Sequence, residues 1–156
     1  MPAVFRHTNI VSHDPDRLAR FYIDVFGCER EGPERHLSGD WIERGTGLAG
    51  ATITGVMLRL PGFGQSAPRL EIFRVAGAEA AAPAQVTRPG LMHLCFEVDD
   101  AQETLDRILA AGGRVLGEIV DSGEVPGVGR ADFVYARDPD DNIVELIAWN
   151  RIVPAS

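Results

Sequence analysis

The two halves of this 156-residue chain repeat one pattern. In each half, a strand-like run that begins at a histidine leads into a helix-like segment, which starts after an aspartate and stops at a glycine. An offset of 86 residues relates three pairs of positions: His7 and His93, Asp14 and Asp100, and Gly27 and Gly113. Repetition at a fixed offset indicates similar structural units. We therefore expect a fold made of two related modules.

Each half is expected to contain one helix and several strands. Asp14 and Pro15 are typical of a helix start, and Gly27 is typical of a helix end. The expected strands, identified from apolar runs bounded by turn residues, are 4–12, 51–60, 69–75, 91–98, 115–120, 133–136 and 143–149. Residues 28–50 have turn signals but no clear period, and residues 123–129 resemble a mobile loop. The pattern predicts an α+β fold of two βαβββ modules, with helices covering one sheet face.

The modules are expected to form one domain over residues 1–156. The first module comprises residues 1–75, an Ala- and Pro-rich linker follows in residues 76–89, and the second module comprises residues 90–156. Hydrophobic residues make up 45% of the chain, which suffices for one substantial core. Each half alone would be small for a stable core, so a single paired domain is favoured over two independent ones.

Composition narrows the expected partners and location. The formal net charge is −8 and no cluster of basic residues is present, which argues against binding to nucleic acid or to an anionic membrane. No apolar run approaches the roughly 20 residues of a membrane-spanning helix, and the first residues lack a signal-peptide pattern. The two cysteines, Cys28 and Cys95, do not make a disulfide framework. We expect a cytoplasmic protein that binds a small molecule.

Two histidines and two glutamates occupy matching places in the halves. His7 and His93 lie on the first strand of each half, and Glu71 and Glu145 lie on the last. Alternate strand residues point to the same face, so a histidine and a glutamate on neighbouring strands can converge. Imidazole and carboxylate are good ligands for first-row divalent metals. A solvated sheet face would also accommodate these side chains, but each glutamate interrupts an apolar strand, and the four together favour a metal site.

Other polar residues carry weaker signals. His13 and His36 have no counterpart in the other half and are expected at the surface. Cys95 shares a face with His93, where a thiolate could bind metal, although a small strand residue beneath the site is the favoured role. Five charged residues could line a substrate funnel, but solvated surface is favoured for each: Glu43, Arg59, Arg69, Arg130 and Asp132.

Four segments resemble the vicinal-oxygen-chelate superfamily, which includes glyoxalases, extradiol dioxygenases and bleomycin-resistance proteins. The matching segments are His7 to Gly27, Leu70 to Phe73, Gly90 to Asp100 and Asp138 to Ile147, which together span nearly the whole chain. The resemblance implies paired βαβββ modules around a cupped, mostly antiparallel sheet with its helices on the outer face. It also implies a glyoxalase-like member.

The resemblance places metal ligands at His7, Glu71, His93 and Glu145. It implies one divalent ion, which could be Ni, Co, Zn, Mn, Mg or Fe. Glyoxalase-like members carry glutamate at the position of Glu71, whereas epimerase-like members commonly carry glutamine there. Members of the superfamily also exchange modules between subunits, so a homodimer is expected, with each site either within one chain or shared between two.

These features lead to a hypothesis of metal-dependent proton transfer next to a carbonyl, as in a lyase or isomerase. Glu145 would act as the base, with Glu71 as its near-symmetric counterpart. The expected substrate is a 2-oxoaldehyde–thiol adduct or an acyl-CoA thioester. One alternative is an Fe(II) extradiol-type dioxygenase, which needs two histidines and one carboxylate. The other alternative is a non-enzymatic protein that sequesters an antibiotic or another small molecule.

Overall fold

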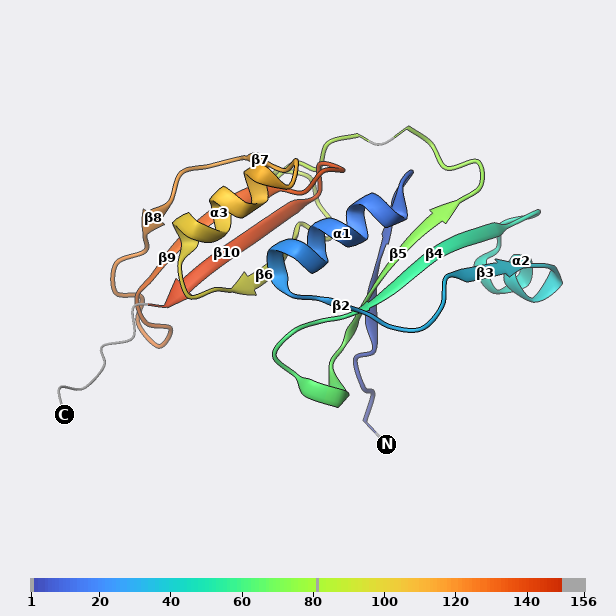
Figure 1. The fold of residues 1–156 in the computed structure, drawn as a ribbon, viewed down its shortest axis with the longest axis horizontal. Coiled ribbons are helices and arrows are strands. Elements are labelled where there is room, and N and C mark those ends of the chain that lie inside the picture. The colour runs from blue at the N-terminus through green and yellow to red at the C-terminus, as the bar shows by residue number, and fades with distance from the viewer. Residues whose placement is uncertain (1, 81, 150–156) are drawn as a thin grey trace. The chain divides into compact units, whose positions relative to one another are not determined.

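Each half of the chain folds into a βαβββ module (Figure 1). The structure is a computed structural model that describes residues 2–80 and 82–149. The chain divides into two compact units, with the boundary after Ala80. Within the described stretches, no helix combines the length and apolarity needed to cross a bilayer. The expected α+β class and the two modules are confirmed.

The first unit contains one mixed sheet. Its elements are β1 (His7–Val11), α1 (Pro15–Phe26), β2 (Glu29–Arg30), β3 (Arg35–Ser38), α2 (Asp40–Thr46), β4 (Thr52–Arg59), a short 3-10 helix η1 (Gly64–Ser66) and β5 (Arg69–Val75). Strand β1 runs parallel to β5, and β5 runs antiparallel to β4. Both β2 and β3 pair with β4, so together they act as one interrupted edge strand.

The second unit repeats this topology. Its elements are β6 (His93–Glu97), α3 (Ala101–Ala110), β7 (Arg114–Val115), β8 (Val120–Asp121), β9 (Ala131–Arg137) and β10 (Ile143–Trp149). Strand β6 runs parallel to β10, and β10 runs antiparallel to β9. Both β7 and β8 pair with β9 as a second interrupted edge strand. The predicted repeat therefore extends to the order and direction of the strands.

Both helix starts and the end of α1 follow the predicted capping pattern, whereas α3 ends at Ala110 with Ala111 as its C-cap, before the expected stop at Gly113. The Asp14 carboxylate accepts a hydrogen bond from the backbone N–H of Arg17 at 3.0 Å, and the Asp100 carboxylate accepts one from Glu103 at 2.8 Å. Each bond satisfies one of the amides that a helix start leaves unpaired. Gly27 ends α1 with a left-handed φ of 71°, a conformation that costs glycine little. Local sequence alone therefore defines both major helices.

One face of each sheet is buried under its helix. In the first unit, alternate residues of β4 and β5 pack against α1: Val56, Leu58, Leu70 and Ile72 are all at most 1% exposed. In the second unit, Val134, Ala136, Val144 and Leu146 are buried in the same way in the sheet that contacts α3. Each fully buried side chain of this size contributes about 1.5–3 kcal/mol. Because strand residues alternate, the glutamates between these positions face away from the helices.

The structure differs from the predicted elements in four places. The first strand is shorter than residues 4–12, and residues 115–120 hold the ends of two short strands instead of one. Residues 28–50, which had no assigned elements, contain β2, β3 and α2. Residues 123–129 form a turn closed by paired backbone hydrogen bonds between Val125 and Gly129. Strands of two to four residues have no period to detect, because pairing with β4 or β9 defines them.

Candidate functional site

His7 and Glu71 meet on the open face of the first sheet. In the parallel pairing of β1 and β5, His7 lies opposite Arg69, and Glu71 follows two residues later on the same face. The His7 Nε2 and Glu71 Oε2 atoms are 3.4 Å apart. The Glu71 side chain is 14% exposed and that of His7 is 49% exposed. The carboxylate therefore lies inside the face and the imidazole lies at its rim.

His93 and Glu145 form the equivalent pair in the second unit. His93 lies opposite Ile143 in the parallel pairing of β6 and β10, and Glu145 again follows two residues later. The His93 Nε2 and Glu145 Oε2 atoms are 3.0 Å apart, and their side chains are 25% and 18% exposed. The sequence repeat thus produces the same imidazole–carboxylate pair, at the same strand register, in each unit.

The neighbours of the two carboxylates differ. Cys95 and Tyr135 lie opposite Glu145 on its two flanking strands. Burial, followed by the charge of Glu145, raises the pKa of Cys95 to about 12, although part of the residue is exposed. Burial also raises the pKa of Tyr135, and the charge of Glu145 adds to this rise. Both groups therefore keep their protons at neutral pH beside the Glu145 carboxylate.

Asn9 and Met57 occupy the corresponding places beside Glu71. The Met57 thioether has no proton to donate. Tyr135 could have been found from sequence, because the turn at residues 139–142 joins two antiparallel strands. Counting residues outward from this turn pairs Tyr135 with Glu145. The surroundings of Glu71 and Glu145 therefore differ because different residues lie opposite them on the neighbouring strands.

The two pairs suit a divalent ion. Metal bonds to nitrogen and oxygen of about 2.1 Å put adjacent ligands of one ion about 3.0–3.4 Å apart, and the two pairs have these separations. The Nδ1 atom of His93 is buried and has no hydrogen-bond partner among the described residues, so no protein acceptor assigns its tautomer. Across residues 2–80 and 82–149, no three histidine, cysteine, aspartate or glutamate side chains form a group that could hold a metal. The expectation that both pairs serve one ion stays a prediction.

Several other polar residues lie away from these pairs. His13 and His36 are exposed, as expected. His13 lines a depression of about 320 Å³ at the start of α1, together with Glu34 and Arg74, on the helix-covered side of the first sheet. His36 contacts Glu34 at 3.4 Å. A second depression of about 470 Å³, also lined by His13 and Arg74, likewise does not coincide with the His–Glu pair.

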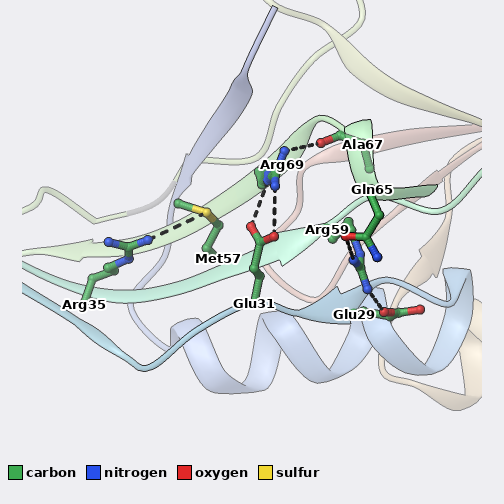
Figure 2. Close-up of polar contacts among 8 residues, drawn as sticks. All are labelled: Glu29, Glu31, Arg35, Met57, Arg59, Gln65, Ala67 and Arg69. Atoms are coloured by element: carbon green, nitrogen blue, oxygen red, sulfur yellow. Dashed lines mark hydrogen bonds and ion pairs between the residues drawn. The ribbon is translucent and has the colours of Figure 1, made fainter. Parts of the chain in front are cut away.

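Three of the five charged residues that could line a funnel occur in ion pairs. Arg69 binds Glu31, and Arg59 binds Glu29, on the open face of the first sheet (Figure 2). In the second unit, Arg130 binds Asp121 next to the turn at residues 123–129, and this contact lowers the pKa of Asp121. Glu43 lies on α2, and Asp132 lies opposite Asp121 in the pairing of β8 and β9. Sequence alone did not identify Glu29, Glu31 or Asp121 as partners.

Comparison with known proteins gives a family and several similar folds. The family model described as Glyoxalase/Bleomycin resistance protein/Dioxygenase superfamily matches residues 4–146. No curated protein sequence matches the chain. A glyoxalase family protein from Bacillus cereus is similar in structure, with a TM-score of 0.79, 22% identity and 93% of each chain covered.

Two further structures show the same fold. The fosfomycin resistance protein FosX from Listeria monocytogenes has a TM-score of 0.57 and 14% identity, and the match covers 97% of this chain and 94% of that one. A glyoxalase I variant from Zea mays has a TM-score of 0.62 and 23% identity, and the match covers 92% of this chain and 43% of that one. These similarities establish the fold.

Proposed function

The chain belongs to the glyoxalase/bleomycin resistance protein/dioxygenase superfamily, and we propose that it is a divalent-metal-dependent lyase or isomerase that moves a proton next to a carbonyl. One observation carries this proposal: both units present an imidazole–carboxylate pair at the same register, with separations of 3.4 and 3.0 Å. A surface ion pair would not need to recur at equivalent positions of two modules.

His7, Glu71, His93 and Glu145 would hold the ion through two ring nitrogens and two carboxylate oxygens. A divalent ion bound there supplies Lewis acidity that polarises a substrate carbonyl. The histidine and the glutamate of each pair lie on neighbouring parallel strands, and the glutamate lies two residues after the residue opposite the histidine. This support limits the side-chain motion that would otherwise cost entropy on substrate binding.

Glu71 and Glu145 are the groups in this set that can accept and return a proton. A carboxylate takes the proton from the carbon next to the carbonyl and returns it to the same carbon in a thioester, or to the neighbouring carbon in a 2-oxoaldehyde–thiol adduct, so the products contain the same atoms and electrons as the substrate. Glu145 has Tyr135 and Cys95 beside it as potential donors. Glu71 has the Asn9 amide in the place of Cys95, but Met57, which donates no proton, in the place of Tyr135. The hydroxyl beside Glu145 and its absence beside Glu71 favour Glu71 as the carboxylate that moves, which reverses the roles expected from the sequence, where Glu145 was the base.

The substrate we propose is a small thioester or a 2-oxoaldehyde–thiol adduct. Both have an acidic C–H bond beside a carbonyl, which is the bond that a carboxylate base can break. We also propose a cytoplasmic homodimer, in keeping with the composition and with the module exchange expected of this superfamily.

Hydrogen exchange at substrate carbon tests the proposal. The chain loaded with Mn²⁺ or Ni²⁺ is incubated in D₂O with a panel of thiol adducts and acyl-CoA thioesters, and deuterium incorporation is measured by NMR. We expect Glu71→Gln to slow exchange by about 10²–10⁴-fold, because general-base catalysis contributes on that order. Glu118→Gln, which changes an exposed acid of the second unit, is the control and should exchange at the wild-type rate.

Retention of full exchange by metal-loaded Glu71→Gln and Glu145→Gln would contradict the proposal. Oxygen uptake with a catechol would instead indicate the dioxygenase alternative. Ligand binding by metal-free protein that His93→Ala leaves unchanged would indicate a sequestering protein.

A further inference from the structure

The linker between the two modules is fastened to the second sheet at Ala84. The Ala84 N–H donates to the Asp141 carbonyl at 3.2 Å, and the Ala84 carbonyl accepts from Arg137 Nη2 at 2.8 Å. The other terminal nitrogen of Arg137, Nη1, donates to the Asp141 carbonyl at 2.8 Å. Arg137 therefore ties the linker to the turn between β9 and β10, although 53 residues separate it from Ala84 in the sequence.

This part of the linker has a single point of attachment. Among the described residues 82–91, Ala84 alone hydrogen-bonds to the rest of the second unit, whereas Arg88 donates to Gln85 within the linker at 3.1 Å. Ala84 is also the one residue of this stretch that is not exposed. We call residues 84–92 the strap, because this segment begins at the attachment and ends where His93 starts β6.

Arg137 and the ends of the strap lie in one row across the second sheet. Arg137 lies opposite Ile143, and Ile143 lies opposite His93, so the row crosses β9, β10 and β6. Paired residues share a sheet face, so this row belongs to the open face that also carries Glu145, two residues further along β10. Because the Arg137 side chain leaves the open face, its bond to the Ala84 carbonyl holds the start of the strap on the same side.

The middle of this row is covered. Ile143 is 2% exposed although it points away from α3, whereas Glu145 and Ile147, the next residues on the same face of β10, are part-exposed. The Nδ1 atom of His93 is buried as well. The strap joins the two ends of the row, Arg137 and His93, which lie about 10 Å apart across two strand spacings. It therefore runs beside the covered side chains.

The equivalent arginine of the first unit makes different contacts. Arg59, like Arg137, lies two residues after the residue opposite the glutamate of its unit. Arg59 donates to the side chains of Glu29 and Gln65. Arg137 instead donates to two backbone carbonyls, and within residues 2–80 and 82–149 no carboxylate forms an ion pair with it. The repeat therefore supplies an arginine at both places, and only the second unit uses it to hold the linker.

We propose that the strap, latched by Arg137, holds the His93 ring in the orientation that the candidate metal site needs, which makes Arg137 a positioning residue. The role in metal binding rests on the proposed function. The planar guanidinium directs its two bonds in fixed directions and so holds one end of the strap. The pairing of β6 with β10 holds the other end. A segment fixed at both ends limits rotation of the imidazole and keeps solvent from its Nδ1 side.

Chemical modification of the histidines tests the latch without metal. Diethyl pyrocarbonate acylates neutral imidazole nitrogens, and peptide mass spectrometry over time measures the rate at each histidine of the metal-free chain. We expect Arg137→Gln to speed the modification of His93 several-fold, because the released strap no longer shields the ring. The exposed His36 of the first unit should react at an unchanged rate in the same sample.

Arg114→Gln is the matched control, since Arg114 pairs with the Asp141 carboxylate at the same turn and has no hydrogen bond to the strap. It should keep the wild-type rate at His93. An unchanged His93 rate in Arg137→Gln, or an equal increase in Arg114→Gln, would overturn the assignment. If circular dichroism shows that Arg137→Gln does not fold, Ala84→Pro decides in its place, because it removes the N–H bond of the strap and leaves every strand unchanged.

Mn²⁺ affinity, measured by electron paramagnetic resonance of the free ion, tests the link to the metal site. Arg137→Gln should bind about tenfold more weakly than wild type or Arg114→Gln, since loss of a group that orients a metal-binding histidine typically costs 10–100-fold. Arg137→Lys, which can still donate to both carbonyls, should restore most of the affinity. Equal affinities in wild type and Arg137→Gln would refute the positioning role. If wild type binds no Mn²⁺, the proposed function fails, yet faster His93 modification in Arg137→Gln would still support the latched strap.

Discussion

At the scale of single residues, two glutamates in equivalent positions differ because the side chains next to them differ. Glu71 and Glu145 occupy the same register in their modules, yet the groups across from them are Met57 in one unit and Tyr135 in the other. A hydroxyl can hold a carboxylate in place, and a thioether cannot. The pseudo-symmetric sequence therefore produces a chemically asymmetric pair of half-sites.

The alkylation rate of the Cys95 thiol is a measure of the negative charge of Glu145 beside it. Burial and the nearby Glu145 charge raise its pKa to about 12, so little thiolate exists at pH 8. We predict that Glu145→Gln speeds iodoacetamide alkylation of Cys95 in the metal-free chain several-fold, because removing the negative charge lowers the thiol pKa. Peptide mass spectrometry over time measures the rate.

Cys28 is the internal control for that prediction, since burial alone raises its pKa to about 12. Its slow alkylation should not change in Glu145→Gln. An unchanged Cys95 rate would show that Glu145 has no electrostatic influence on the thiol.

At the scale of elements, the turn between β9 and β10 sets the register on which the second half-site depends. The fully buried Asp138 accepts hydrogen bonds from the backbone N–H groups of Asp140 and Asn142 at 2.9 and 3.0 Å. Its other oxygen accepts from the Asn142 side chain at 2.9 Å. This Asx-type turn aligns Tyr135 with Glu145, because the position of the turn fixes which residues of β9 and β10 lie opposite each other.

Loss of the Asp138 carboxylate should destabilise this hairpin. We predict that Asp138→Ala lowers the free energy of unfolding by about 1–3 kcal/mol, since it leaves the part-buried backbone N–H groups of Asp140 and Asn142 without this acceptor. Urea denaturation followed by circular dichroism measures the change. The exposed Glu118→Ala should unfold at the wild-type midpoint, and equal midpoints for the two variants would argue against a structural role for the turn.

At the scale of the whole molecule, each unit is a complete βαβββ module but carries only half of the expected ligand set. Protein metal sites for zinc and similar ions use three or four protein ligands, and each unit presents two. The functional unit we propose therefore requires both modules, from one chain or from two.

Metal stoichiometry tests this requirement. We predict one divalent ion per chain in protein purified without chelator, and loss of most of it in both His7→Ala and His93→Ala, because either change removes one of four shared ligands. Inductively coupled plasma mass spectrometry measures the content, with the exposed His36→Ala as the control. Two ions per chain, with one retained in each variant, would show that the pairs bind independently.

The sequence by itself determined the features that depend on nearby residues. The caps at Asp14 and Asp100 and the longer strands follow from local periods and from turn residues, and the offset of 86 residues between the halves then singled out the four candidate ligands. These signals persist in a single sequence because helix and strand geometry relates residues only a few positions apart.

The tertiary structure decided which distant residues meet. Strand pairing placed Cys95 beside Glu145 and matched Arg69 with Glu31. It also defined the short strands β2, β3, β7 and β8, which form only against longer neighbours. The physical reason is that strand register depends on the packing of whole sheets and on turn geometry, and no local period encodes it.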